Sequence, residues 1–320
     1  MPASSPLTLI RRLAAALALC PLLALAQAPL PPLAAEVNEE AETPPPAADT
    51  LPLLTATVDG RTEQIPVEDL SNPMVLIETT RGGMLFELFP REAPETVANF
   101  LGLADGSKPW IDPYTQNEER RPFYDGLTFY RVVNGALIQG GSPTGDAQGY
   151  PGYFLPDEIN AASLGLDRMS VLDAQGAPSP VLGVRDQQDF QEMVLKPLYD
   201  SLNINSSAQL QARLGEADQK LRALSVQQLF ELRGYRYRND LLSRAPVRGV
   251  IAMASNEPNQ NGSQFFITLT DADWLLGRHT VFGKIRAGLD VLDAIGRARV
   301  NAEGRPQPDV TILSIRVLPR

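Results

Sequence analysis

The chain has 320 residues, which is enough for one or two domains with a complete hydrophobic core. Acidic residues outnumber basic ones by 38 to 28, and the formal net charge of −10 at pH 7 argues against a nucleic-acid partner, because phosphates repel an acidic surface. A single histidine and a single cysteine leave too few ligands for a transition-metal site, so we expect no metal and no cofactor.

Residues 1–26 have the pattern of a secretory signal peptide. Arg11 and Arg12 precede an apolar run over residues 13–25, and the small residue Ala26 completes a cleavage pattern. The run is shorter than the roughly 20 apolar residues that a membrane-spanning helix needs. We therefore expect cleavage after Ala26, export, and a periplasmic location in a bacterium.

Cys20 lies within this apolar run, so cleavage would leave a mature chain with no cysteine and no disulfide. The four residues that end at Cys20 faintly resemble a bacterial lipoprotein signal, although Leu19 is bulkier than that pattern favours. An envelope lipoprotein anchored through Cys20 is the alternative location.

Alanine, proline and glutamate dominate the chain from residue 27 to residue 59, where no apolar periodicity is visible. A segment of this composition buries too little apolar surface to fold by itself. We expect a disordered or extended linker over residues 27–70, followed by one domain over residues 71–320.

Short strand patterns recur through this domain, with two short helices among them. Apolar and β-branched runs predict strands at residues 74–79, 84–89, 127–133, 136–139, 249–254, 264–269, 280–285 and 311–318. Pro94 and Gly106 favour a helix near residues 93–101, and a second helix is expected near residues 289–296. This order predicts a mainly β, antiparallel architecture, and the strand count alone fits a sandwich as well as a barrel.

Residues 160–245 break the strand pattern and are predicted to be helical. Apolar residues recur there at spacings of three and four, as on one face of an amphipathic helix, at Leu210, Leu214, Ala217, Leu221 and Leu224. Ser225 followed by Gln228 has the pattern of a capping box that opens a further helix. We expect a helical hairpin whose apolar stripe packs internally, and a client-binding surface is the alternative.

Arg131 interrupts an apolar strand with a charge that arginine cannot lose inside a protein. Alternate residues of a strand share a face, so Phe129, Arg131 and Val133 are predicted to face one way. Tyr130 and Val132 are predicted to face the other way.

Two further strands can present side chains to the same groove. Leu137 and Gln139 keep the parity of Arg131, provided that the Asn134-Gly135 turn preserves the count. Gln264 and Phe266 share a face of another strand. The groove would then contain a cation, two amides and apolar groups.

Several short motifs follow one another in a distinctive order. They are Phe-x-Arg-Val-Val at 129–133, Gln-Gly-Gly at 139–141, Pro-Thr-Gly at 143–145, Asn-Gly-Ser-Gln-Phe-Phe-Ile at 261–267, Trp-Leu at 274–275, Gly-Arg-His at 277–279 and Val-Phe-Gly at 281–283. In this order they resemble the cyclophilin family of peptidyl-prolyl cis/trans isomerases, over residues 72–319. The resemblance implies a closed antiparallel β-barrel plugged by two helices. It also makes residues 160–245 an inserted α-helical hairpin, where a typical member has a short loop.

Arg131 is the candidate catalytic group. Rotation about a peptide bond is slow because the nitrogen lone pair is delocalised into the carbonyl, with a barrier of roughly 18–20 kcal/mol. A guanidinium that donates hydrogen bonds near the prolyl nitrogen localises this lone pair and weakens the partial double bond, most strongly where water is scarce. This role requires no nucleophile, metal or proton shuttle.

The resemblance assigns further groove residues, position by position. Gln139 matches a glutamine that binds the substrate backbone and helps to orient the arginine. The proline pocket would be formed by Ala136, Leu137, Phe266, Leu275 and His279, and the peptide would be held along the groove by Ser255, Asn256, Gln264 and Trp274.

Ala136 departs from the family pattern, which has a phenylalanine on the pocket wall at this position. Loss of that aromatic contact would weaken proline binding by about 1–3 kcal/mol if nothing fills the space. Reduced activity and a replacement side chain from the helical insert are both compatible with this difference.

The sequence therefore indicates an exported peptidyl-prolyl cis/trans isomerase that acts, as a monomer, on unfolded or partly folded polypeptides containing proline. The alternative is a proline-binding chaperone or scaffold with weak or no turnover. Arg131 and Gln139 favour catalysis, whereas Ala136 and the helical insert favour the scaffold. The sequence contains no Gly-x-Ser-x-Gly elbow and no Gly-Lys-Ser/Thr phosphate loop that would favour another enzyme class.

Overall fold

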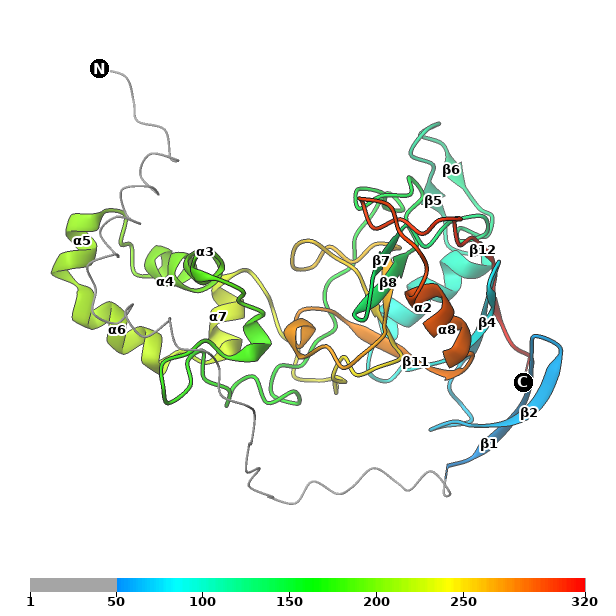
Figure 1. Cartoon of the computed structure of the whole chain (residues 1–320), viewed down its shortest axis with the longest axis horizontal. Coiled ribbons are helices and arrows are strands. Elements are labelled where there is room, and N and C mark those ends of the chain that lie inside the picture. The colour runs from blue at the N-terminus through cyan, green and yellow to red at the C-terminus, as the bar shows by residue number, and fades with distance from the viewer. Residues whose placement is uncertain (1–50, 320) are drawn as a thin grey trace.

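The computed structural model describes residues 51–319 (Figure 1). The predicted signal peptide at residues 1–26, with Cys20, and residues 27–50 of the predicted linker lie outside this part of the chain. Within residues 51–319, no helix combines the length and the apolar character that crossing a membrane requires.

A β-hairpin of β1 (Leu53–Val58) and β2 (Arg61–Pro66) occupies the region where the end of the linker is predicted. Its two-residue turn is formed by Asp59 and Gly60, whose φ angles of 50° and 73° match the turn that suits twisted hairpin strands. One face of the hairpin is buried in a small apolar cluster that includes Ile65. This stretch is thus paired strand rather than linker.

The main sheet contains eight antiparallel strands in the order β12-β3-β4-β11-β9-β10-β8-β7. These strands are β3 (Met74–Thr79), β4 (Gly82–Leu88), β7 (Arg131–Val133), β8 (Leu137–Gly140), β9 (Val250–Met253), β10 (Phe265–Thr268), β11 (Val281–Ala287) and β12 (Ile312–Val317). A separate pair, β5 (Trp110–Ile111) and β6 (Glu118–Glu119), lies outside this sheet. Each strand region predicted above contains one strand of the main sheet.

The sheet curls strongly, so that its two edge strands, β7 and β12, approach each other. An isolated bridge joins Thr128 to Thr311 beside these edges, and the Phe129 N–H donates to the Val310 carbonyl at 2.9 Å. The two edge strands are not paired with each other in the strand order. The antiparallel sheet is confirmed, but it forms a curled half-barrel rather than the predicted closed barrel.

Two helices pack into the core of the curled sheet, α2 (Pro94–Asp105) and α8 (Leu289–Gly296). Phe100 of α2 and Leu292 of α8 belong to the same buried cluster as strand residues. As predicted, Pro94 lies in the first turn of α2, and Gly106 ends this helix in a left-handed conformation with φ of 80°.

Residues 160–245 form a mainly helical part of the chain, called the helical segment below. Its elements are the 3₁₀-helix η3 (Pro180–Leu182), α3 (Gln187–Phe190), the π-helix η4 (Gln191–Leu195), α4 (Lys196–Ser201), α5 (Ser207–Ala212), α6 (Leu214–Ala223) and α7 (Val226–Leu232). Figure 1 shows α3 to α7 gathered on one side of the curled sheet. They have an apolar cluster of their own around Leu166, Val194 and Phe230, separate from the cluster inside the sheet.

The prediction of a simple helical hairpin is therefore wrong. α3, η4 and α4 form one continuous run, and the predicted apolar stripe is divided between α5 and α6. The division falls at Arg213, whose φ of −121° and ψ of 20° are not helical. The predicted capping box is confirmed, since Gln228 N–H donates to the Ser225 hydroxyl and Ser225 N–H donates to the Gln228 side chain.

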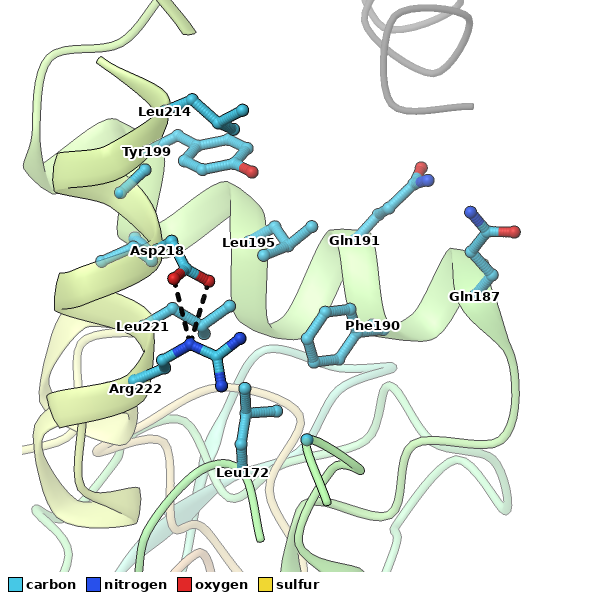
Figure 2. A pocket seen from close by; sticks show the side chains of 13 residues that line it. Leu172, Gln187, Phe190, Gln191, Leu195, Tyr199, Leu214, Asp218, Leu221 and Arg222 are labelled. Atoms are coloured by element: carbon cyan, nitrogen blue, oxygen red, sulfur yellow. Dashed lines mark hydrogen bonds and ion pairs between the residues drawn. The ribbon is translucent and has the colours of Figure 1, made fainter. Parts of the chain in front are cut away.

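An apolar hollow of about 140 Å³ opens between the continuous run and α6. Figure 2 shows Phe190 and Leu195 on one side of it, and Leu221 and Arg222 on the other. Arg222 is held at the rim by Asp218, to which its Nε donates at 3.0 Å.

The two ends of the helical segment are tied to each other. Asn160 donates from its N–H to the Ser243 hydroxyl at 2.8 Å and from Nδ2 to the Leu241 carbonyl at 2.6 Å. The segment therefore leaves and rejoins the sheet domain at one place.

A buried carboxylate ties the hairpin to the sheet. Glu87 of β4 is fully buried, and its side chain accepts hydrogen bonds from the N–H groups of Glu68 and Asp69, each at 2.9 Å. Arg286 of β11 donates to the same carboxylate from Nε at 2.7 Å. Glu68 in turn pairs with Arg244, from the end of the helical segment, at 2.7 Å.

Candidate active site

One row of side chains crosses five strands on the outer face of the curled sheet. Arg131 is directly opposite Gln139, Gln139 is opposite Phe266, Phe266 is opposite Ala252, and Ala252 is opposite Val281. Directly opposite residues on antiparallel strands share a face. The predicted association of Arg131, Gln139 and Phe266 on one surface therefore follows from the strand register.

Arg131 lies at the exposed end of this row. Its Nη1 donates to Gln139 Oε1 over a long 3.4 Å, and no carboxylate of residues 51–319 lies within 4.0 Å of its guanidinium. A surface arginine without an ion pair keeps its donors available to a ligand.

The predicted parity is wrong at Phe129. Phe129 is fully buried inside the curled sheet, whereas Arg131 faces outward. The ring of Phe129 packs edge-to-face on that of Phe265, with the ring centres 6.0 Å apart. The alternation fails because the regular strand begins only at Arg131, so the two preceding residues are not constrained to a pleat.

A chain of hydrogen bonds orients Gln139. Its Nε2 donates to the Tyr130 hydroxyl, which donates to Gln264 Oε1 at 2.5 Å, and Gln264 Nε2 donates to the Gly149 carbonyl at 2.7 Å. Burial raises the pKa of Tyr130 to about 12, so its hydroxyl remains a donor at neutral pH. With Nε2 committed, Gln139 directs its oxygen to Arg131. The sequence prediction placed Tyr130 on the opposite face and missed this role.

The apolar part of the groove surrounds Phe266, which is only 3% exposed. Leu137 and Leu275 pack against the same cluster, and the His279 ring contacts Phe266 edge-to-face at 5.1 Å. Ala136 is half-buried in the turn between β7 and β8, where its N–H donates to the Val133 carbonyl.

His279 is a neutral wall residue. Burial and the positive charge of Arg278 lower its pKa to about 4. Its Nδ1 lies 3.1 Å from the Met253 carbonyl, and since a carbonyl only accepts, Nδ1 carries the proton. The imidazole is therefore fixed in orientation and uncharged at neutral pH.

A second, more polar hollow of about 200 Å³ continues the groove. It is lined by three predicted site residues, Ser255, Asn256 and Gln264. Tyr150 and Phe154 also line it, with their rings stacked at 4.9 Å, and both side chains are exposed. Neither aromatic residue was identified from the sequence, because both lie outside the motifs that carry the family resemblance.

One loop belongs to both the groove and the helical segment. In residues 273–280, Leu275 packs against the groove cluster, whereas the next residue, Leu276, is buried in the core of the helical segment. The Tyr237 hydroxyl donates to the Gly277 carbonyl at 2.9 Å. Trp274, at the groove margin, remains 36% exposed.

Comparison with known proteins identifies the family. The family model described as "Cyclophilin type peptidyl-prolyl cis-trans isomerase/CLD" matches residues 74–317. The chain belongs to the cyclophilin family. The matched residues lie within the region of resemblance predicted from the motifs, residues 72–319.

Peptidyl-prolyl cis-trans isomerases of several organisms are similar to this chain along most of their length. Peptidyl-prolyl cis-trans isomerase B of Streptomyces anulatus is 30% identical over 244 residues, covering 75% of this chain and 94% of the relative. Peptidyl-prolyl cis-trans isomerase A of Mycobacterium tuberculosis is 28% identical over 250 residues, covering 78% and 93%. A crystal structure of a Cryptosporidium parvum cyclophilin type isomerase has a TM-score of 0.46 at 21% identity, covering 78% of this chain and 99% of that one.

As a cyclophilin, the protein is a peptidyl-prolyl cis-trans isomerase, and its ligands are proline-containing peptides. The predicted enzyme class is thereby confirmed. The roles of individual groove residues remain predictions.

Proposed function

We propose that Arg131 is the hydrogen-bond donor that accelerates rotation of X-Pro bonds, in a groove whose apolar floor is Phe266. The observation that carries this proposal is the cross-strand row in which Gln139 lies between these two residues. A proline ring against Phe266 would have its amide near the guanidinium. Localisation of the nitrogen lone pair then lowers the rotational barrier.

Orientation of the guanidinium is the second part of the proposal. Gln139 is held by Tyr130 and Gln264, so its oxygen provides Arg131 with a fixed partner. A pre-oriented donor needs no rearrangement as the peptide bond twists, which favours the transition state over the planar ground state.

The other groove residues are proposed to bind substrate. The proline ring is enclosed by Ala136, Leu137, Leu275 and His279, and the flanking peptide is held by Ser255, Asn256, Gln264 and Trp274. The neutral, fixed imidazole of His279 supports a wall role rather than proton transfer.

We also propose that residues 160–245 are an insertion in a single isomerase domain, residues 71–320, that works as a monomer. Two observations support an insertion: the segment has its own apolar core, and Asn160 ties its beginning to Leu241 and Ser243 near its end.

We propose that the protein acts in the periplasm on exported polypeptides, on the basis of the signal pattern in residues 1–26. Mass spectrometry of the protein purified from the cell envelope is expected to give a chain that begins at Gln27. A chain that begins at Cys20 and carries lipid would support the lipoprotein alternative. An unprocessed chain in the cytoplasm would contradict export.

The rival function is a scaffold that holds proline-containing clients without turnover, and the small Ala136 and the apolar hollow of the helical segment favour it. Magnetisation-exchange NMR on a short X-Pro peptide separates the two functions. We expect the protein to accelerate cis/trans exchange at substoichiometric concentration. Peptide shifts that change on binding, with an unchanged exchange rate, would support the scaffold instead.

A further inference from the structure

Arg233 and Arg278 are the two arginines of residues 51–319 that have a buried nitrogen atom with no hydrogen-bond partner. The unpartnered atoms are Nη1 of Arg233 and Nε of Arg278. Other partly buried arginines of the described chain have carboxylate partners, as for Arg238, Arg244 and Arg286. A guanidinium removed from water without an acid is costly, so this pair needs an explanation.

Both guanidinium groups lie near the same aromatic ring. Their central carbons lie 5.8 Å and 5.9 Å from the ring centre of Phe230, which is fully buried. Burial, together with the positive charge of Arg233, lowers the pKa of Arg278. The positive charges of Arg233 and Arg278 therefore repel each other at a position that is partly shielded from water.

Two acidic side chains of this region, Asp157 and Glu231, are engaged elsewhere. Asp157 accepts hydrogen bonds from the Asn259 N–H at 2.9 Å and from Asn261 Nδ2 at 2.8 Å. Glu231 accepts from Gln227 Nε2 at 2.8 Å. Within residues 51–319, no carboxylate lies within 4.0 Å of either guanidinium.

Both side chains are partly exposed, and of their nitrogens only Nη1 of Arg233 and Nε of Arg278 are fully buried without a partner. The other guanidinium nitrogens make no hydrogen bond to the described residues, so they are the donors that a ligand would use. Arginine donors in this state match the two oxygens of a carboxylate.

The position of Arg278 connects the pair with the groove. Gly183 lies beside both Arg278 and Trp274. A Cβ atom added to this glycine would be 3.8 Å from Arg278 Nη2 and 3.2 Å from Trp274 Cβ. The next residue along the chain, His279, packs on Phe266. A peptide that occupies the groove and passes Trp274 would therefore come close to these donors.

We propose that Arg233 and Arg278 form an anion-binding subsite at the end of the groove, which takes the carboxylate of an aspartate or glutamate near the client's X-Pro bond. The helical segment contributes Arg233, and the loop of residues 273–280 contributes Arg278, so the subsite exists only where these parts meet. This inference rests on the proposed function of the groove, because the same peptide must occupy both sites.

The test compares peptides that differ in one charge. Glutamate or glutamine is placed in turn at each of four positions on either side of an X-Pro unit, and KM is measured for each pair. In the wild-type protein, we expect glutamate to lower KM about fivefold at one or more positions, as for a partly exposed ion pair. Both Arg233→Gln and Arg278→Gln are expected to bring the KM ratio close to one.

Arg236→Gln is the matched control, because Arg236 is an exposed arginine of the same segment. It should leave the ratio as in the wild type. The ratio within each variant cancels a general loss of activity, and Arg233→Gln provides the test by itself if Arg278→Gln does not fold. Turnover of the glutamine peptides reports separately on the proposed function of the groove.

Two outcomes would overturn the proposal. One is a KM ratio close to one at every position in the wild type, and the other is a ratio that both arginine variants leave unchanged. Binding of acetate tests whether the site takes a free carboxylate instead. If both variants abolish acetate binding and the wild type shows no preference for glutamate peptides, the site binds small anions and the proposal of client recognition is rejected.

Discussion

Replacement of Arg131 by alanine is expected to lower kcat/KM for an X-Pro peptide by about 100-fold or more, as for loss of one pre-oriented donor from an active site. The thermal stability should change little, because the side chain is exposed and forms no ion pair with residues 51–319. Exchange NMR on the peptide gives the rate, and circular dichroism confirms the fold.

Two variants provide the controls for this result. Arg81→Ala removes an exposed arginine from the turn between β3 and β4 and should retain the wild-type rate. Arg131→Lys keeps the charge but loses the planar fork, so an intermediate rate is expected. Equal rates for Arg131→Ala and Arg81→Ala would remove Arg131 from the mechanism.

The pH profile provides a further control. Since the pKa of His279 is lowered to about 4, the imidazole is neutral throughout pH 6–8 and undergoes no titration there. A donor mechanism based on arginine therefore predicts a wild-type kcat/KM that is flat over this range. A sigmoidal change near pH 6.5 would instead indicate proton transfer by the single histidine of the chain.

Replacement of Glu87 by alanine is expected to destabilise the sheet domain by about 3–5 kcal/mol, as for loss of one partner from a buried ion pair. The carboxylate is fully buried and accepts from two backbone N–H groups and from Arg286. Its removal leaves the two backbone N–H groups and Arg286 Nε without this acceptor, and Arg286, which is mostly out of water, keeps only Glu68 as a carboxylate partner at 2.6 Å. The chain that follows the hairpin β1–β2, at Glu68 and Asp69, would lose its hydrogen bonds to the sheet.

Denaturant unfolding, followed by the fluorescence of the buried Trp110 in a Trp274→Phe background, measures this effect. Glu118→Ala is the matched control, because Glu118 forms an exposed ion pair with Arg120 at 3.0 Å and should contribute less than about 1 kcal/mol. Equal shifts of the unfolding midpoint in the two variants would contradict a structural role for the buried carboxylate.

Local signals in the sequence predicted the regular elements well. Pro94 and Gly106 bound α2 as their backbone preferences require, and Ser225 with Gln228 opens α7. Asp59-Gly60 is a turn signal for a hairpin, but the composition of the preceding residues favoured a linker at this position. Signals of this kind depend only on neighbouring residues, which explains why they can be read without the fold.

Contacts between distant segments were harder to predict. The motifs brought Arg131, Gln139 and Phe266 together correctly, but strand parity failed at Phe129, where no neighbouring strand enforces the pleat. The position of Tyr130 beside Gln264 depends on this irregularity. The association of Arg233 with Arg278 joins segments 45 positions apart through a core that has no counterpart among the motifs.

The loop of residues 273–280 has a consequence for any attempt to trim the protein to a minimal isomerase. Leu275 and Leu276 are consecutive, yet each is covered by a different body of the molecule. In a shortened chain without residues 160–245, Leu276 would be exposed to solvent, directly next to Leu275 in the groove. Such a truncation would expose an apolar surface beside the groove. A loss of turnover in the shortened chain would then reflect a distorted groove wall rather than the loss of a client-binding region.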